Sequence, residues 1–209
     1  MTIVCAVLAA GESQRLGFPK QLLPWANATN LVQHAVDCAQ QTQCARVGVV
    51  VGAHAASVKR TLFGRRVEFI PSDWQLGLSA SVRAAALWAR STRASALLLC
   101  VCDQPYLSAE HLMRLIARSR FGGQLAASRY AGNAAVPALF PLNYLDHLLR
   151  LEGDQGASAL LSAANETALV DWPDGEFDID TASDIARAAA RAWPERRAWA
   201  LASLKQSQI

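Results

Sequence analysis

Residues 8–20 read Leu-Ala-Ala-Gly-Glu-Ser-Gln-Arg-Leu-Gly-Phe-Pro-Lys and follow directly on an apolar run from Thr2 to Leu8. The apolar run is rich in β-branched residues and predicts a buried strand. The loop after it is made of small residues, which let backbone N–H groups approach a phosphate closely, and Arg15 and Lys20 add positive charge beside it. The stretch therefore predicts a strand that runs into a loop suited to a nucleoside triphosphate.

The spacing separates this loop from two common nucleotide-binding patterns. Five residues separate Gly11 from Gly17 and two separate Gly17 from Lys20, whereas a Walker loop needs Gly-x-x-x-x-Gly-Lys followed by Ser or Thr. The dinucleotide pattern Gly-x-Gly-x-x-Gly is also missing. The alternative interpretation is an ordinary strand-to-helix turn that carries two solvated cations.

Length and composition favour one large domain, with or without a small C-terminal extension. Of the 209 residues, 52% are hydrophobic and 18% are charged, which allows a sizeable core. We expect one domain over residues 1–192 and a helical extension over 193–209. A net charge of +3 without a basic run argues against nucleic acid as a partner, and no apolar run reaches the roughly 18 residues of a membrane span.

The five cysteines are an odd number, and three of them lie in apolar, strand-like runs. This usage favours reduced core thiols over a disulfide framework. The Cys100-x-Cys102 pair has no second Cys or His pair at metal-ligand spacing, so we interpret it as structural. With no leader pattern at the N-terminus, the expected compartment is the cytoplasm and no membrane contact is expected.

Strand-like and helix-like segments alternate along the chain. Strands are predicted at 2–8, 46–51, 67–70, 94–101, 124–129, 136–140 and 168–171, and helices at 30–41, 53–62, 77–90, 108–118, 141–149, 155–164 and 182–192. Because the strands are solid apolar runs, they predict a Rossmann-like, mostly parallel sheet with helices on both faces. In such sheets ligands bind beyond the carboxyl ends of the strands.

Asp103 follows a buried apolar run and precedes Gln104 and Pro105. A carboxylate at the end of a central strand, where a proline stops the ladder, is placed to hold a divalent cation. The alternative role is that of a turn former or helix cap. Asp103 and the loop at 9–20 are expected at the same edge of the sheet.

Asp178 and Asp180 form a second acidic site near the end of the domain. In an extended segment the two carboxylates face the same side, so either could be the second ligand of a cation. The alternative is that one of them caps the helix that begins near Ala182, a role for which Thr181 competes.

The segment from Ser72 to Ser81 joins a strand to a helix and contains Trp74. Gly77, Ser79 and Ser81 leave the N-terminus of that helix open to an anion or a base edge. An ordinary loop, anchored by Trp74 and capped by a serine, explains the same residues. The glycine-flanked turn at 153–157 indicates only a loop, and the four histidines are interpreted as solvated or core.

Six motifs in this order resemble the MobA-like nucleotidyltransferases, in particular their molybdenum cofactor cytidylyltransferase branch. They are Leu8-Ala-Ala-Gly-x-Ser-x-Arg-Leu-Gly-x-x-Lys20, Asp73-Trp-x-x-Gly-Leu-Ser-x-Ser81, Asp103-Gln-Pro105, Pro137-x-Leu-Phe140, Gly153-Asp-x-Gly-Ala157 and Asp178-Ile-Asp-Thr181. The resemblance spans roughly residues 3–190. It implies an α/β fold of the nucleotide-diphospho-sugar transferase type.

The resemblance implies Mg²⁺-dependent transfer of CMP from CTP to the terminal phosphate of molybdopterin, with release of pyrophosphate. Arg15, Lys20 and Asp103 would be catalytic, and Asp103 with Asp180 would hold Mg²⁺. The implied nucleotide-binding residues are Leu8, Ala9, Ala10, Gly11, Ser13, Arg15, Lys20, Ser72, Gly77, Ser79 and Ser81. The implied acceptor-binding residues are Gln104, Pro137, Asp154 and Asp178.

Three departures from the family pattern fall mainly on the acceptor side. Ser72 stands where the family often has Asn, Ser158 where it often has Arg, and Ala135 where it usually has Gly. The alternatives are therefore guanylyl transfer to molybdopterin, another phosphorylated acceptor such as a sugar phosphate, or a non-catalytic accessory protein that delivers the cofactor. A transient contact with a molybdoenzyme or its chaperone is also implied.

Overall fold

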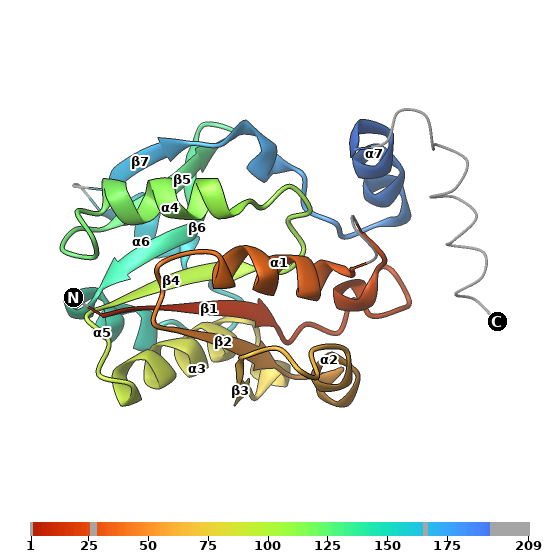
Figure 1. The fold of residues 1–209 in the computed structure, drawn as a ribbon, viewed down its shortest axis with the longest axis horizontal. Coiled ribbons are helices and arrows are strands. Elements are labelled where there is room, and N and C mark those ends of the chain that lie inside the picture. The colour runs from red at the N-terminus through yellow and green to blue at the C-terminus, as the bar shows by residue number, and fades with distance from the viewer. Residues whose placement is uncertain (1, 26–28, 165–166, 193–209) are drawn as a thin grey trace.

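The computed structural model describes residues 2–25, 29–164 and 167–192 and contains a seven-stranded sheet, drawn in Figure 1. The expected extension at 193–209 lies outside the described residues. The sheet has the order β3-β2-β1-β4-β6-β5-β7. Its strands are β1 (Ile3–Ala9), β2 (Arg46–Val51), β3 (Glu68–Pro71), β4 (Ala96–Val101), β5 (Ala126–Tyr130), β6 (Asn133–Pro141) and β7 (Ala168–Asp171).

The sheet is mixed but mostly parallel, as the sequence predicts. β1 pairs in parallel with β2 and β4, and β7 pairs in parallel with β5. β6 is the exception, since it runs antiparallel to both β4 and β5. The reason is a tight hairpin, in which Ala131 and Gly132 both have positive φ, the conformation of two-residue hairpin turns.

Helices cover both faces of the sheet (Figure 1). Alternate residues of β1 point to opposite faces: Val7 packs with α1 and α4, while Ala6 packs with α3 and α5. Burial on both faces explains why the strands are continuous apolar runs. The helices are α1 (Leu31–Gln40), α2 (Ala55–Thr61), α3 (Leu78–Ser91), α4 (Ala109–Arg118), α5 (Leu145–Leu149), α6 (Ser158–Ala163) and α7 (Ala182–Ala192).

A third apolar cluster lies beside the sheet and attaches α7 to the segment after β1. Its buried members are Leu23, Trp25, Leu31, Ile179, Ile185 and Ala188. We call these six residues the α7 cluster. Figure 1 shows α7 next to the segment that follows β1, at one end of the sheet. The α7 cluster therefore holds the acidic segment at 178–180 close to the predicted phosphate loop.

All five cysteines are free thiols; Cys44 is partly exposed and the other four are buried. This agrees with their interpretation as core residues. No helix in the described part of the chain is long and apolar enough to cross a membrane.

Candidate active site

β1 and β4 are adjacent and parallel, with Leu8 opposite Val101, so the segments after both strands emerge at the same edge of the sheet. A cleft of about 480 Å³ lies at this edge. Of the predicted site residues, it is lined by Leu8, Ala9, Ala10, Gly11, Ser13, Arg15, Lys20, Gly77, Ser81, Asp103, Asp154 and Asp180. The prediction that the loop and Asp103 converge is confirmed.

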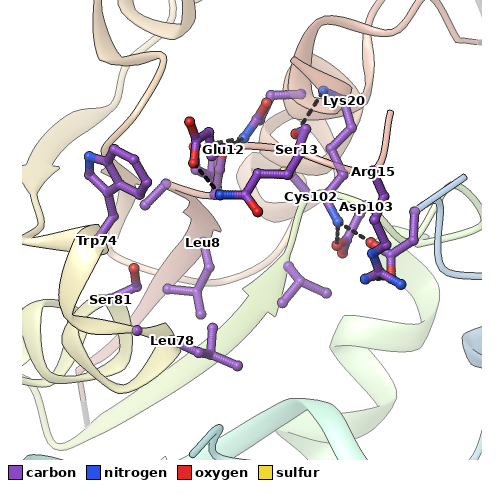
Figure 2. A pocket seen from close by; sticks show the side chains of 18 of the residues that line it. Leu8, Glu12, Ser13, Arg15, Lys20, Trp74, Leu78, Ser81, Cys102 and Asp103 are labelled. Carbon is purple, nitrogen blue, oxygen red and sulfur yellow. Dashed lines mark hydrogen bonds and ion pairs between the residues drawn. The ribbon is translucent and has the colours of Figure 1, made fainter. Parts of the chain in front are cut away.

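Lys20 links the two carboxylates that were predicted to bind metal. Its Nζ lies 2.5 Å from Oδ2 of Asp103 and 2.7 Å from Oδ1 of Asp180. Arg15 donates to the other oxygen of Asp180 at 2.8 Å. Figure 2 shows Lys20, Arg15 and Asp103 together at one end of the cleft. We call this end, formed by Arg15, Lys20, Asp103 and Asp180, the charged end.

The charged groups at this end shift one another's pKa values. Loss of hydration lowers the pKa of Lys20, but the carboxylates of Asp103 and Asp180 outweigh this effect and hold the pKa above its ordinary value. Burial raises the pKa of Asp180, yet its hydrogen bonds and attraction to Lys20 and Arg15 hold the net pKa below the usual value. Lys20 therefore stays an ammonium and Asp180 stays a carboxylate at neutral pH.

The backbone explains why Asp180 reaches Lys20. The N–H of Ile179 donates to the carbonyl oxygen of Asp103 at 3.0 Å, which fixes the two segments side by side. Thr181 caps α7, because its Oγ1 accepts from the N–H of Asp184 while Asp184 accepts from the N–H of Thr181. Of the two roles left open for Asp180, the cap is thus filled by Thr181, and the Asp180 carboxylate faces the cleft.

Gln21 holds the backbone of the loop in place through two hydrogen bonds. It is 1% exposed, and its Nε2 donates to the carbonyl oxygen of Gly11 at 2.6 Å and to that of Ala9 at 3.3 Å. Ser13 has a positive φ of 62°, and its hydroxyl accepts from the N–H of Lys20 at 3.1 Å. These contacts close the loop on itself. The sequence reasoning missed Gln21, whose signal was a polar residue just before Leu22 and Leu23.

The opposite end of the cleft is formed by Trp74, Leu78 and Ser81, which Figure 2 shows away from Lys20. With Asp154, these three residues form what we call the ring end. Of these residues, Asp154 was predicted to bind the acceptor and Trp74 to anchor the loop. Leu78 was not predicted to lie in the site. The α3 N-terminus and the turn at 153–157 supply this wall.

Two predicted nucleotide-binding residues do not line the cleft. Ser72 Oγ lies 3.1 Å from Ser81 Oγ, so Ser72 supports a lining residue. Ser79 is fully buried, and its hydroxyl accepts from Nη1 of Arg83 at 2.9 Å. Their side chains therefore lie behind the wall of the cleft.

Three of the four predicted acceptor-binding residues also lie outside the lining. Gln104 is 2% exposed and donates to the Tyr130 hydroxyl at 3.0 Å. Pro137 follows a cis peptide bond in β6. Asp178 is exposed beside the charged end. Partial loss of hydration and the negative charges of Asp103 and Asp180 raise its pKa to about 7. Only Asp154 reaches the cleft.

The charged end fits a divalent cation. Oxygens of Asp103 and Asp180 both lie within hydrogen-bond distance of a single nitrogen, so the two carboxylates converge on one cationic group. Within the described ranges, no group of three or more His, Cys, Asp or Glu side chains could hold a metal. A Mg²⁺ ion bound by one or two carboxylates takes its remaining ligands from substrate phosphates and water, and these residues meet that requirement.

The fold and this site define the class of NTP-dependent nucleotidyltransferases. A family model described as the MobA-like NTP transferase domain matches residues 5–168. The chain belongs to this family.

The chain is also similar to individual proteins over most of its length. Purine catabolism protein PucB of Bacillus subtilis (strain 168) is 29% identical over 191 residues, covering 86% of this chain and 92% of PucB. The crystal structure of Rv0371c from Mycobacterium tuberculosis H37Rv is 29% identical with a TM-score of 0.78, covering 90% of this chain and 97% of that chain. A structure of Rv0371c in complex with manganese is 27% identical, with a TM-score of 0.72 and the same coverage.

A more distant structure shares the fold alone. It is the molybdopterin-guanine dinucleotide biosynthesis protein A from Archaeoglobus fulgidus, at 19% identity and a TM-score of 0.67, covering 90% of this chain and 98% of that chain.

Proposed function

We propose that this protein transfers CMP from CTP to the terminal phosphate of molybdopterin and releases pyrophosphate. The observation that carries the proposal is the charged end, where the Lys20 ammonium bridges Asp103 and Asp180 directly beside a glycine-containing loop. Two cations and two carboxylates at the mouth of a phosphate loop suit a substrate that arrives as a metal-bound triphosphate.

In this proposal, Arg15 and Lys20 bind the triphosphate. Nucleotidyl transfer needs in-line positioning and neutralisation of the charge that develops on the leaving pyrophosphate. The attacking group is already a phosphate, so no general base is required. Backbone groups of Leu8, Ala9, Ala10, Gly11 and Ser13 approach the nucleotide, as do Gly77 and Ser81, while Ser72 and Ser79 support the wall behind them.

Asp103 and Asp180 would hold Mg²⁺. When bound, the ion neutralises negative charge on the phosphates and orients them. The manganese complex of the relative Rv0371c supports a divalent cation in this family. For Lys20 the consequence is a change of partner, from the two carboxylates to a phosphate oxygen.

On the acceptor side, Asp154 has the most direct access, and Gln104, Pro137 and Asp178 would shape the surface next to it. The relative PucB carries a name from purine catabolism, so a different phosphorylated acceptor is the second candidate. Guanylyl transfer to molybdopterin and a cofactor-binding accessory role are the further alternatives. A cytoplasmic location, with a molybdoenzyme or its chaperone as a transient partner, completes the proposal.

The test is product analysis with the purified protein, Mg²⁺, molybdopterin and each of CTP, GTP, ATP and UTP in turn. We expect a molybdopterin cytosine dinucleotide by mass spectrometry, with one pyrophosphate released per dinucleotide, from CTP only. A guanine dinucleotide would move the protein to the guanylyl branch. Binding of CTP without any dinucleotide would contradict molybdopterin as the acceptor.

A further inference from the structure

Arg83 lies near the start of α3 and has no acidic partner among the residues that the structure describes. Its Nη1 instead donates to the carbonyl oxygen of Leu151 at 2.5 Å and to the Ser79 hydroxyl at 2.9 Å. Leu151 is 5% exposed and Ser79 is fully buried. A half-buried guanidinium is thus committed to two neutral oxygens, one on α3 and one on the segment after α5.

The loop at 151–156 is pressed against the first residues of α3. The N–H of Ser79 donates to the carbonyl oxygen of Gly153 at 3.1 Å, so the loop supplies a cap for the helix. A Cβ on Gly77 would lie 2.3 Å from that same oxygen and 2.8 Å from Oδ1 of Asp154. The two segments therefore lie too close together for any side chain at position 77, where the φ of +93° also favours glycine.

Asp154 is the residue that this fit places in the cleft. It lines the ring end together with Trp74, Leu78 and Ser81. Apolar walls and one carboxylate acceptor suit a flat nitrogen heterocycle whose N–H groups donate hydrogen bonds. Both the base of a nucleotide and the ring system of a pterin have this chemistry.

We propose that Arg83 is a positioning residue that holds the loop at 151–156 against the Gly77 turn and so sets Asp154 for recognition of a nitrogen heterocycle. This inference rests on the proposed function for the presence of a triphosphate at the charged end. Arg83 does not touch the ligand. It acts through the Leu151 carbonyl, and its loss affects the ring end while leaving the charged end intact.

The test compares two ligands that share the triphosphate but not the ring. Affinities for CTP and for inorganic tripolyphosphate, each with Mn²⁺, are measured by calorimetry on the wild type and on Arg83→Met. The Michaelis constant for molybdopterin is measured on the same proteins. Arg90→Met is the matched control, since Arg90 lies on the exposed side of α3 and pairs with Asp146.

We expect Arg83→Met to weaken the binding of one of the two ring-bearing ligands, CTP or molybdopterin, about tenfold. The affinity for tripolyphosphate should stay within about twofold of the wild-type value. Loss of CTP affinity would assign the ring end to the base, and a raised Michaelis constant for molybdopterin would assign it to the acceptor. Asp154→Asn should reproduce the same loss, and the double variant should be no weaker than Asp154→Asn alone. Arg83→Lys keeps a donor and should recover part of the affinity.

Unchanged values for both CTP and molybdopterin in Arg83→Met would overturn the inference, as would an equal loss of tripolyphosphate affinity. Should Arg83→Met fail to give a cooperative thermal transition, Arg83→Lys and Asp154→Asn provide the same comparison. A wild type that binds no Mn²⁺-tripolyphosphate would instead contradict the proposed function itself, so the two failures are distinct.

Discussion

The backbone N–H of Ile179 donates a hydrogen bond to the carbonyl oxygen of Asp103, with 3.0 Å between nitrogen and oxygen. Ile179 is fully buried in the α7 cluster, while Asp103 lies in the turn directly after β4. The contact means that the packing of α7 sets the distance between Asp103 and the residue after Ile179, Asp180. Metal and phosphate binding at the charged end should therefore respond to changes in the α7 cluster.

Ile185→Ala tests this dependence. Ile185 is 4% exposed, and truncation of a buried isoleucine typically costs about 2–5 kcal/mol of unfolding free energy. We expect this loss together with weaker binding of Mn²⁺-CTP, because α7 then holds Asp180 less firmly. Ile116→Ala, at a 2% exposed position of α4, is the matched control and should lose stability without losing affinity. Equal affinities in the two variants would show that α7 does not position Asp180.

Lys20→Ala should nearly abolish nucleotidyl transfer. Removal of one charged contact to the triphosphate in a site that excludes water costs about 2–4 kcal/mol of transition-state stabilisation, which is roughly 30- to 1,000-fold in rate. Pyrophosphate release is the measurement. Lys59→Ala removes an exposed lysine that lies over the Phe69 ring and should leave the rate unchanged. Wild-type turnover by Lys20→Ala would refute the assignment of Lys20 to the triphosphate.

Lys20→Met should also raise the affinity for a divalent cation when no nucleotide is present. In the wild type the ammonium neutralises both carboxylates, so an added ion must compete with it. Without the ammonium, the carboxylates of Asp103 and Asp180 can bind the ion with no competing cation. Titration of Mn²⁺, with the free ion followed by electron paramagnetic resonance, measures this directly. An unchanged or lower Mn²⁺ affinity in Lys20→Met would be inconsistent with a shared cation position.

His111 should make the fold less stable in mild acid. It is 3% exposed, lies 2.7 Å from the Ser128 hydroxyl and stacks on Trp172. Burial, with a smaller contribution from Arg114, lowers its pKa from 6.5 to about 4. The unfolded chain therefore binds a proton more readily than the native one, and stability falls as the pH drops from about 6.5 to 4.

Urea unfolding at pH 7.5 and pH 5 measures this effect, for which the pKa difference predicts about 2 kcal/mol. His111→Gln removes the titration and keeps a donor toward Ser128, so between pH 7.5 and pH 5 the wild type should lose about 2 kcal/mol relative to His111→Gln. The comparison between the two proteins isolates His111 from Asp178, whose raised pKa acts in the opposite direction. An identical pH dependence in both proteins would exclude His111 as the cause.

Most of the fold was predictable from hydrophobic pattern, and the exceptions have physical causes. All seven strands were expected near their observed positions because each is a compact apolar run. The antiparallel direction of β6 was not predictable, since a strand buried on both faces has the same hydrophobic pattern in either direction. It follows from the tight turn at Ala131 and Gly132, whose positive φ values the sequence reasoning did not consider.

The charged end was predictable and its supports were not. Lys20 and Asp103 follow adjacent parallel strands, so their meeting follows from topology. Gln21 and Arg83 act on backbone carbonyls of Gly11 and Leu151, and such contacts have no sequence spacing to recognise. The burial of Ser79 did have a signal, because it shares the buried face of α3 with Val82 and Ala86 at helical spacing.

The most direct test of the central claim is a crystal structure with Mn²⁺ and CTP, in which anomalous scattering locates the metal. The account predicts manganese bound by both Asp103 and Asp180, with the Lys20 ammonium moved from the carboxylates to a phosphate of CTP. Manganese at another position, or a Lys20 that still bridges both carboxylates beside bound CTP, would contradict it.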